Sequence, residues 1–317
     1  MKSSILRPGG LFVVSLVVAA ACGSSSMGGG IAGTSSVLGA ISGFGSIIVG
    51  GIEFDTSNAM ITIEGDPVTE SDLKLGMVAA VRGVVDRRSQ RGAADVVTVN
   101  HLAEGPLDAV AASTGTLLLL GQEVMSDTQT VFDPVPLAEL EPDDVVEVNG
   151  FLDTSGRIRA TRVERKVGET DIELRGFIED LDADESSFRI GGLVVEFSGA
   201  LIESAPATGL ANGLFVEIEA EDRPVGGVFV AVGVEVIDPT LMADVGDGLG
   251  VEGFVTQITS ATEFVVNGSQ RVRITPGTRF EGGDASDLAL DRFVDVDGVA
   301  DPDGVLAATE VEFSRGP

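Results

Sequence analysis

The sequence predicts an all-β protein of four tandem small modules, each a five-stranded β-barrel of the OB-like type. Three observations predict this class. Related motifs recur at spacings of 66, 71 and 77 residues, runs of alternating apolar and polar residues lie between Gly-rich turns, and the 317 residues include 42 glycines but no tryptophan or tyrosine. An open sandwich of antiparallel sheets has the same strand count and remains the alternative.

The N-terminal segment has the three parts of an export signal. Lys2 and Arg7 give a basic start, an apolar run begins at Leu11, and small alanines precede Cys22. A membrane-spanning helix needs about 20 apolar residues, so this run is too short to span a bilayer. We therefore expect residues 1–21 to be a signal peptide.

Cys22 is the only cysteine of the chain. The stretch Ala19-Ala-Ala-Cys22 resembles the lipobox of bacterial lipoproteins, in which the cysteine becomes the lipidated N-terminus. The resemblance implies that Cys22 anchors the protein to a membrane and, because Gly23 follows, that this is the outer membrane of the cell envelope. The same residues also suit ordinary signal cleavage, which would leave a secreted protein with one free thiol.

Residues 22–36 contain the anchor and a segment rich in glycine and serine. Such a composition cannot bury an apolar core and behaves as a flexible coil. We expect this segment to be a tether that holds the folded part about 20 Å from the membrane.

The chain is strongly acidic, with 20 basic and 50 acidic residues and a formal net charge of −30. Loss of Lys2 and Arg7 with the signal leaves 18 basic residues and a net charge of −32. Nucleic-acid affinity comes largely from basic side chains that neutralise phosphates, so we expect no nucleic-acid partner. An excess of acidic residues is also typical of proteins kept soluble by their charge.

Each module is predicted to begin with a glycine-containing strand and a hairpin. The opening glycines are Gly39, Gly105, Gly176 and Gly253. The first hairpin reads Ile47-Ile-Val-Gly-Gly-Ile-Glu-Phe54, and its Gly-Gly pair supplies the positive φ that a two-residue turn needs. The corresponding hairpins are predicted at residues 117–124, 188–195 and 264–272.

The second half of each module is predicted to hold two more strands. In Val146-Glu-Val-Asn-Gly150, apolar and polar residues alternate up to a turn glycine, which indicates a strand with one buried face. Before this strand, segments such as 71–76 and 286–290 predict one or two helical turns, and a final β-rich run follows it. The modules are expected at residues 37–103, 104–170, 171–240 and 241–317, packed end to end through short connections.

The ordered motifs resemble the bacterial repeat family called domain of unknown function 5666. The resemblance rests on the Gly-x-Ile/Val start, the G-S-I-I-V-G-G-I-E-F hairpin, D-L-K-L-G, V-E-V-N-G and the D-G-x-x-A-T-x-V-E ending. It covers nearly all of the chain from Val37 to Phe313. The third copy diverges most, with Ala220 in place of the turn glycine and Val230-Ala-Val-Gly in place of Ala-Thr. The family implies no particular activity.

The sequence offers few residues for catalysis. His101 is the only histidine, which excludes a His-rich metal site and leaves little room for a His-based triad. We interpret His101 as a solvated surface residue. No Gly-x-Ser-x-Gly elbow or P-loop is present, and Cys22 is assigned to the anchor. We therefore expect no enzyme activity, no catalytic residue and no cofactor.

Some acidic residues have the two-residue spacing of carboxylates in Ca²⁺ loops. These calcium candidates are Asp180, Asp182, Asp184, Asp301 and Asp303. Neither cluster continues into a twelve-residue loop with a terminal glutamate, so Asp-rich turns are the preferred interpretation and no metal is expected. Two further pairs are expected on outward strand faces, where charge discourages edge pairing: Glu217/Glu219 and Asp295/Asp297.

The sequence favours a non-enzymatic scaffold or binding protein whose partner is an unidentified protein or glycan. One alternative is an enzyme, or an accessory subunit of one, with a site between modules. Another is a Ca²⁺-stiffened, adhesin-like surface rod. A cleft that draws different acidic side chains from two modules would favour the enzyme, whereas solvent-facing acids that do not converge would favour the scaffold.

Overall fold

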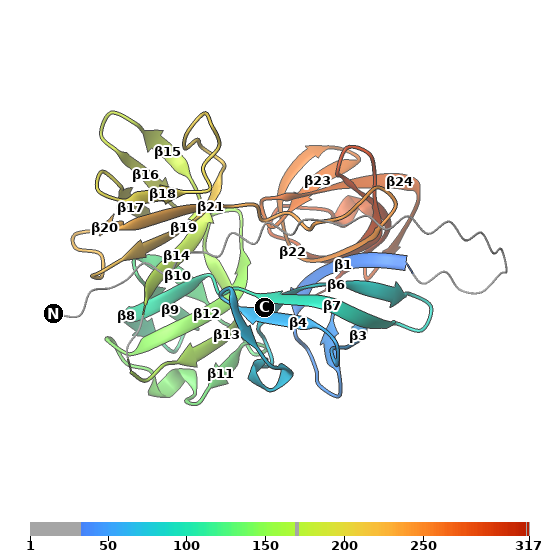
Figure 1. The fold of residues 1–317 in the computed structure, drawn as a ribbon, viewed down its shortest axis with the longest axis horizontal. Helices are drawn as coiled ribbons and strands as arrows, with labels where there is room; N and C mark the ends of the chain where they lie inside the picture. The colour runs from blue at the N-terminus through green and yellow to red at the C-terminus, as the bar shows by residue number, and fades with distance from the viewer. Residues whose placement is uncertain (1–32, 169–170, 315, 317) are drawn as a thin grey trace.

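The computed structural model describes residues 33–168, 171–314 and 316, and within them the fold is all-β, with 26 strands and three short 3₁₀ turns (Figure 1). The predicted signal peptide, the lipidated Cys22 and the tether up to residue 32 lie outside the described residues. In the described part of the chain, no helix has the length and apolar character that a bilayer-spanning helix needs.

The first unit consists of seven strands and a 3₁₀ turn at Glu70–Asp72. The strands are β1 (Gly33–Ala40), β2 (Ile47–Val49), β3 (Ile52–Asp55), β4 (Met60–Ile63), β5 (Asp66–Val68), β6 (Val78–Asp86) and β7 (Arg91–Val99). β1 corrects the predicted end of the tether, because its residues from Gly33 to Ser36 pair with β6. Ser36 is buried, and its hydroxyl donates to the carbonyl of Met242 at 2.6 Å. A Gly/Ser segment forms a strand here because neighbouring groups satisfy its polar atoms.

The second and fourth units are built alike, each with a 3₁₀ turn before its penultimate strand. The second contains β8 (Ala103–Ala111), β9 (Thr116–Leu119), β10 (Gln122–Met125), β11 (Val131–Asp133), the turn Leu137–Glu139, β12 (Val145–Leu152) and β13 (Ile158–Arg165). The fourth contains β22 (Gly248–Ser260), β23 (Glu263–Val266), β24 (Gln270–Glu281), the turn Ala285–Asp287, β25 (Phe293–Ala300) and β26 (Leu306–Phe313). The fourth has one long strand, β24, where the second has β10 and β11. In both, the first strand pairs with the second strand and with the strand after the turn.

The third unit is divided between two sheets. Its strands are β14 (Ile172–Phe177), β15 (Glu179–Asp182), β16 (Ser187–Ile190), β17 (Leu193–Glu196), β18 (Leu201–Glu203), β19 (Phe215–Ala220), β20 (Val228–Val230) and β21 (Gly233–Ile237). β15, β16, β17 and β20 form a four-stranded sheet, whereas the others join a ten-stranded sheet. The break between β20 and β21 falls where the third copy departs from the Ala-Thr motif.

The four predicted hairpins and the two predicted helical turns are confirmed. In the first hairpin, Gly50 and Gly51 have φ angles of +53° and +67°, and in the fourth, Asn267 and Gly268 have 52° and +73°. These positive φ values are those required by the two-residue turns that the sequence indicates. The helical turns are short 3₁₀ segments at the predicted places.

The glycines at the end of the alternating motif were predicted to be turn residues, and this is wrong. Gly83, Gly150 and Gly298 lie inside β6, β12 and β25, each at a bulge in the strand register. A Cβ atom at Gly150 would lie 2.2 Å from the carbonyl oxygen of Arg159 in the neighbouring strand. Glycine is required because two backbones approach closely at the bulge.

The sheets continue across unit boundaries, which corrects the prediction of four separate five-stranded barrels. A twelve-stranded sheet contains strands of the first and fourth units, because β1 pairs in parallel with β22. The ten-stranded sheet contains strands of the second and third units, because β8 pairs with β14. Each unit therefore uses a neighbour to satisfy backbone groups at the edge of its first strand, and none is a self-contained closed barrel.

The units are arranged as two pairs, which corrects the prediction of end-to-end packing. The first and fourth units lie together on the right of Figure 1, and the second and third lie together on the left. Parallel pairing places Ser35, near the start of the described chain, opposite Gly248 of the last unit. A strand of the last unit thus pairs with the first strand of the described chain.

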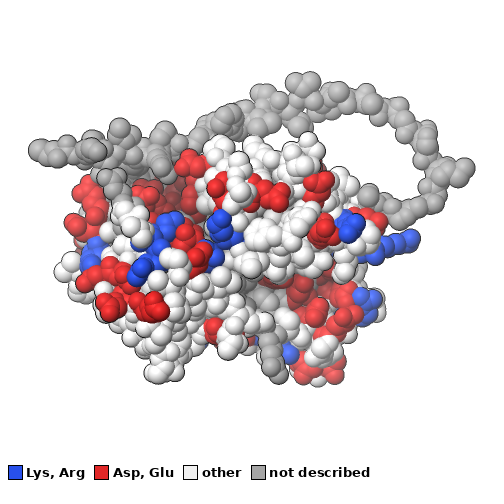
Figure 2. Space-filling model, turned by 90° about the horizontal axis from the view of Figure 1, so that it is seen from below, with Lys and Arg blue, Asp and Glu red and all other residues white. Residues whose placement is uncertain are grey.

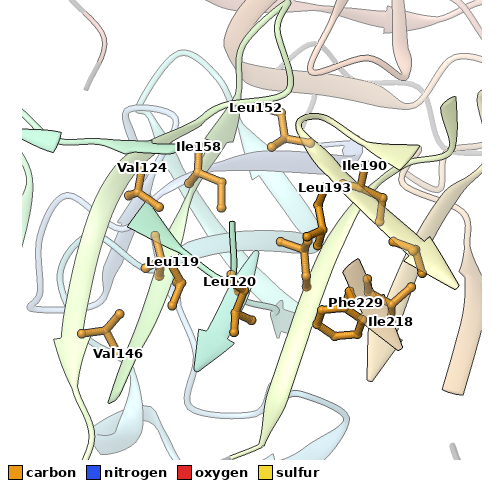
Figure 3. Packing of buried hydrophobic residues seen from close by; sticks show 14 of the residues in the cluster. Leu119, Leu120, Val124, Val146, Leu152, Ile158, Ile190, Leu193, Ile218 and Phe229 are labelled. Carbon is orange, nitrogen blue, oxygen red and sulfur yellow. The ribbon is translucent and has the colours of Figure 1, made fainter. Parts of the chain in front are cut away.

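The second and third units also share one apolar core (Figure 3). Leu119, Leu120 and Val124 from the second unit belong to the same buried cluster as Ile190 and Phe229 from the third. The first and fourth units have separate clusters of their own. Burial of apolar surface therefore holds the second and third units together, in addition to strand pairing.

Candidate functional site

A cluster of buried charged side chains lies where the first three units meet. We call it the ionic junction and define it by five residues: Glu64, His101, Glu173, Arg175 and Glu217. Glu64 follows β4 in the first unit, His101 lies between β7 and β8, and the other three are on β14 and β19 of the third unit. The site therefore exists only when these units are assembled.

His101 is at the centre of the ionic junction. Its Nδ1 atom lies 3.0 Å from Oε1 of Glu64, and its Nε2 atom lies 3.2 Å from Oε2 of Glu173. The side chain is only 5% exposed. The prediction of a solvated surface histidine is wrong, because β14 of the third unit covers a residue that would be exposed if the first module stood alone.

Arg175 connects the third unit to the first. Its Nη1 atom donates to Oε1 of Glu64 at 3.0 Å and to the backbone carbonyl of His101 at 2.6 Å. Its Nη2 atom forms ion pairs with Glu64 and Glu217. A buried guanidinium with two carboxylates fixes the relative positions of the strands that carry them.

The electrostatics of the junction favour the charged forms of its central residues. Burial alone would raise the pKa of Glu64, but His101 and Arg175 outweigh burial and lower it to about 2. Burial alone would lower the pKa of His101, but Glu173 and Glu64 raise it to about 10. The junction thus holds an imidazolium between two carboxylates.

A row of glutamates crosses the sheet beside the junction. Direct cross-strand pairs place five residues in line over β13, β12, β8, β14 and β19, and we call them the glutamate row: Glu164, Glu147, Glu104, Glu173 and Glu219. Like charges directly opposite each other destabilise a sheet. Cations offset part of this repulsion, since Lys166 lies 2.8 Å from Glu147 and Arg162 lies 2.7 Å from Glu164.

Repulsion between carboxylates of the glutamate row persists at Glu219. Burial and the neighbouring carboxylate of Glu173 raise the pKa of Glu219 to about 6. The pKa of Glu217 is also raised, mainly by burial. Both were predicted to lie on an outward face, and this is wrong, because the face turns toward the junction of the second and third units.

A second acidic row lies between the fourth and first units. Glu252, Asp295 and Glu312 are cross-strand neighbours on β22, β25 and β26. Oε2 of Glu252 accepts a hydrogen bond of 2.9 Å from the backbone N–H of Ala40 in β1. Burial, above all, raises the pKa of Glu252 to about 7 and that of Asp295 to about 8. Asp295 is therefore half-buried at a unit boundary, not on the outward face predicted for it.

The calcium candidates do not converge on a common site. Oδ1 of Asp182 accepts the backbone N–H groups of the next turn, Asp184 and Glu185, both at 3.0 Å. Oδ1 of Asp301 accepts the N–H groups of Asp303 and Val305 at 2.8 and 3.0 Å. Asp180 lies in the irregular pairing of β15 and does not join a group of potential ligands among the described residues. These aspartates act as turn residues.

A small cavity of ≈ 150 Å³ lies between the second, third and fourth units. Asp153 and Glu179 contribute carboxylates from two units, and Phe177 contributes an aromatic ring. Both oxygens of Asp153 are already used, because Arg157 Nε donates to Oδ2 at 2.9 Å and backbone N–H groups donate to Oδ1.

Basic side chains are intermixed with acidic ones on the face shown in Figure 2. Such pairing is dense around β13, where four basic side chains each pair with an acidic one: Arg157, Arg162, Arg165 and Lys166. In these pairs the basic side chains neutralise part of the acidic charge of the protein.

The repeats agree with a known family. The sequence model of the Domain of unknown function (DUF5666) matches four times, at residues 37–96, 104–164, 175–235 and 252–312. The chain belongs to the DUF5666 family. A search of curated proteins finds no match. The predicted tandem repeat and its number are therefore confirmed.

The four DUF5666 repeats carry different side chains at three equivalent, cross-paired positions. From the first to the fourth repeat these are Leu38/Ala80/Thr98, Glu104/Glu147/Glu164, Arg175/Glu217/Glu235 and Glu252/Asp295/Glu312. The second and fourth sets are wholly acidic, whereas only the set of the third repeat contains a cation, Arg175. The repeats have thus specialised on a common framework.

The sequence did not single out Glu64, Glu104, Glu147, Glu173 or Arg175 as site residues. Glu147 stands in the alternating motif and Arg175 precedes an opening glycine, so both were visible as repeat positions. What was missing was the pairing of β8 with β14, which joins two repeats in one sheet.

Proposed function

We propose that this DUF5666 protein is an exported, lipid-anchored and non-enzymatic component of the cell envelope, in which four repeats form one rigid scaffold. Its surface serves a protein or glycan partner, and Cys22 supplies the membrane attachment. The observation that carries the proposal is the ionic junction, in which Arg175 joins residues of separate repeats.

Rigidity is supported by three kinds of contact between repeats. Strand pairing links the first repeat with the fourth and the second with the third, an apolar core is shared by the middle two, and buried charges join the first and the third. A flexible string of modules would need few contacts across its boundaries. Fixed repeats instead present an extended surface of constant shape to a partner.

Two measurements test the scaffold. Limited proteolysis of the purified mature chain should leave residues 33 to 314 as one resistant block, and covalent cross-linking in intact cells should capture a reproducible envelope partner. Fragments that correspond to single repeats would contradict a rigid scaffold. A cross-linked partner that is retained by the released Cys22→Ser variant would show that attachment and binding are separate properties.

The second candidate is an enzyme or an accessory subunit with a site between repeats. It is favoured by the cavity between the second, third and fourth units, where Asp153 and Glu179 lie on different repeats. The engagement of Asp153 with Arg157 argues against a role as a free acid or base. A hydrolytic activity on envelope glycans that falls at least tenfold in Glu179→Gln would establish this candidate over the scaffold.

A further inference from the structure

We propose that the ionic junction and the adjoining glutamate row bind one divalent transition-metal ion, Zn²⁺ or Mn²⁺. The ligands are the Nε2 atom of His101 and carboxylates of the row: Glu104, Glu147 and Glu173. This site goes beyond the scaffold function and does not involve the aspartate turns considered as calcium candidates.

Two overlapping groups of three residues, which share His101, each hold their donor atoms close enough for one ion. Ligand atoms of His101, Glu104 and Glu147 all lie within 4.8 Å of one another, and so do those of Glu64, His101 and Glu173. Glu104 is directly opposite both Glu147 and Glu173 in the sheet. The carboxylates are therefore held by paired backbones, and His101 faces them from the connection that precedes β8.

The environment of Nδ1 provides a second observation. His101 is about nineteen-twentieths buried, and its Nδ1 atom lacks an aligned hydrogen bond although Oε1 of Glu64 is 3.0 Å away. Histidine ligands of metals commonly direct their other ring nitrogen at a carboxylate, which fixes the tautomer and the ring orientation. Glu64 is placed for this role, because Arg175 holds it in position.

The charge balance of the described residues also favours a cation. Six glutamates occupy the overlapping groups of potential ligands: Glu64, Glu104, Glu147, Glu173, Glu217 and Glu219. Lys166 pairs with Glu147, and Arg175 pairs with Glu64 and Glu217. Even with His101 charged, negative charge exceeds positive charge in a largely buried region, and buried excess charge is costly. A divalent ion would reduce this excess.

The ligand types select the kind of ion. One imidazole nitrogen combined with carboxylate oxygens suits Zn²⁺ or Mn²⁺, whereas Ca²⁺ and Mg²⁺ prefer oxygen ligands alone. The bound ion would join the second repeat to the third at the point where β8 meets β14.

The test uses the purified full chain, treated with a chelator and then titrated with Zn²⁺ alone or Mn²⁺ alone by calorimetry. We expect one equivalent to bind, with a rise in the melting temperature that Ca²⁺ does not reproduce. His101→Gln and Glu147→Gln should each weaken binding at least tenfold, and Glu64→Gln should weaken it about 10- to 100-fold as an outer-shell change.

A matched control comes from the equivalent row in the fourth repeat, which has the same three acidic positions but no histidine. Glu312→Gln should leave the stoichiometry and affinity unchanged. If His101→Gln does not fold, Glu147→Gln and Glu64→Gln decide the question. Absence of saturable binding by either ion, equal binding by Glu147→Gln, or equal binding of Ca²⁺ would overturn the proposal.

Discussion

Arg175 of the third repeat forms a buried ion pair with Glu64 of the first repeat, although 111 residues separate them in the chain. The same guanidinium also pairs with Glu217 and donates to the backbone of His101. Replacing a buried ion pair by apolar groups can be neutral, but removing one partner leaves an uncompensated charge. The pair therefore specifies how the repeats assemble more than it adds to their stability.

We expect Arg175→Gln to lower the free energy of unfolding by about 3–5 kcal/mol, because Glu64 and Glu217 lose a buried counter-charge. The midpoint of urea unfolding measures the effect. Arg279→Gln is the control, since its pair with Glu310 is exposed at the arginine and its loss should change the stability little. Equal effects of the two substitutions would show that the junction has no special structural role.

The acidic row between the fourth and first repeats predicts that stability falls as the pH rises. Asp295 has a pKa raised to about 8, mainly by burial, and the groups facing it are Glu252, Asp297, Glu312 and Arg87. The unfolded chain has a normal aspartate pKa of about 3.9, so the folded state binds this proton more tightly. The stabilisation is complete below about pH 4 and is lost as the pH rises to about 8.

We therefore expect Asp295→Asn to flatten this decline. At about pH 4 the variant should come close to the parent, because the neutral amide resembles the acid that is protonated in the folded chain, and at pH 9 it should be more stable by at least about 1 kcal/mol. Urea unfolding at both pH values provides the measurement. Asp303→Asn, in an exposed turn, is the control and should not alter the slope. A parent protein whose stability is constant from pH 5 to 9 would contradict the prediction.

The bulge glycines make a packing prediction. Gly150→Ala should destabilise the second repeat by about 1–3 kcal/mol, because the new methyl group meets the carbonyl of Arg159. Gly199→Ala is the matched control, since a Cβ there meets no atom within 4 Å. Thermal melting of both variants compares them directly. If the two variants melt at similar temperatures, the strands around Gly150 accommodate the methyl group without a loss of stability, and the prediction is wrong.

Local features of this fold could be predicted from the sequence because they depend on neighbouring residues. Gly50-Gly51 and Asn267-Gly268 determine two-residue turns by their backbone freedom, and the alternation in Val146–Gly150 marks a strand wherever it is placed. The bulge at Gly150 could not be predicted in this way. Its cause is the backbone of Arg159, which only the paired structure brings near.

The candidate site depends on contacts between repeats, whereas the prediction from the sequence considered each repeat separately. The junction partners of His101, Glu64 and Glu173, lie 37 and 72 residues away in the chain. The same reasoning placed Glu217 and Asp295 on outward faces, because alternation identifies a polar face but not what covers it. Pairing of β1 with β22 and of β8 with β14 supplied the covering strands.

The last prediction concerns the membrane anchor. We expect Cys22→Ser to abolish lipid incorporation and to move the protein from the membrane fraction to the soluble fraction, because a single lipidated cysteine would carry the whole attachment. The folded repeats should be unaffected, so the variant should keep the melting temperature of the parent after both are extracted. Ser24→Ala, two residues along, is the control and should remain in the membrane fraction. Fractionation after metabolic labelling with a fatty acid measures both properties. An unlabelled parent, or a Cys22→Ser variant that still sediments with membranes, would show that the chain is exported without a lipid or is held by another contact.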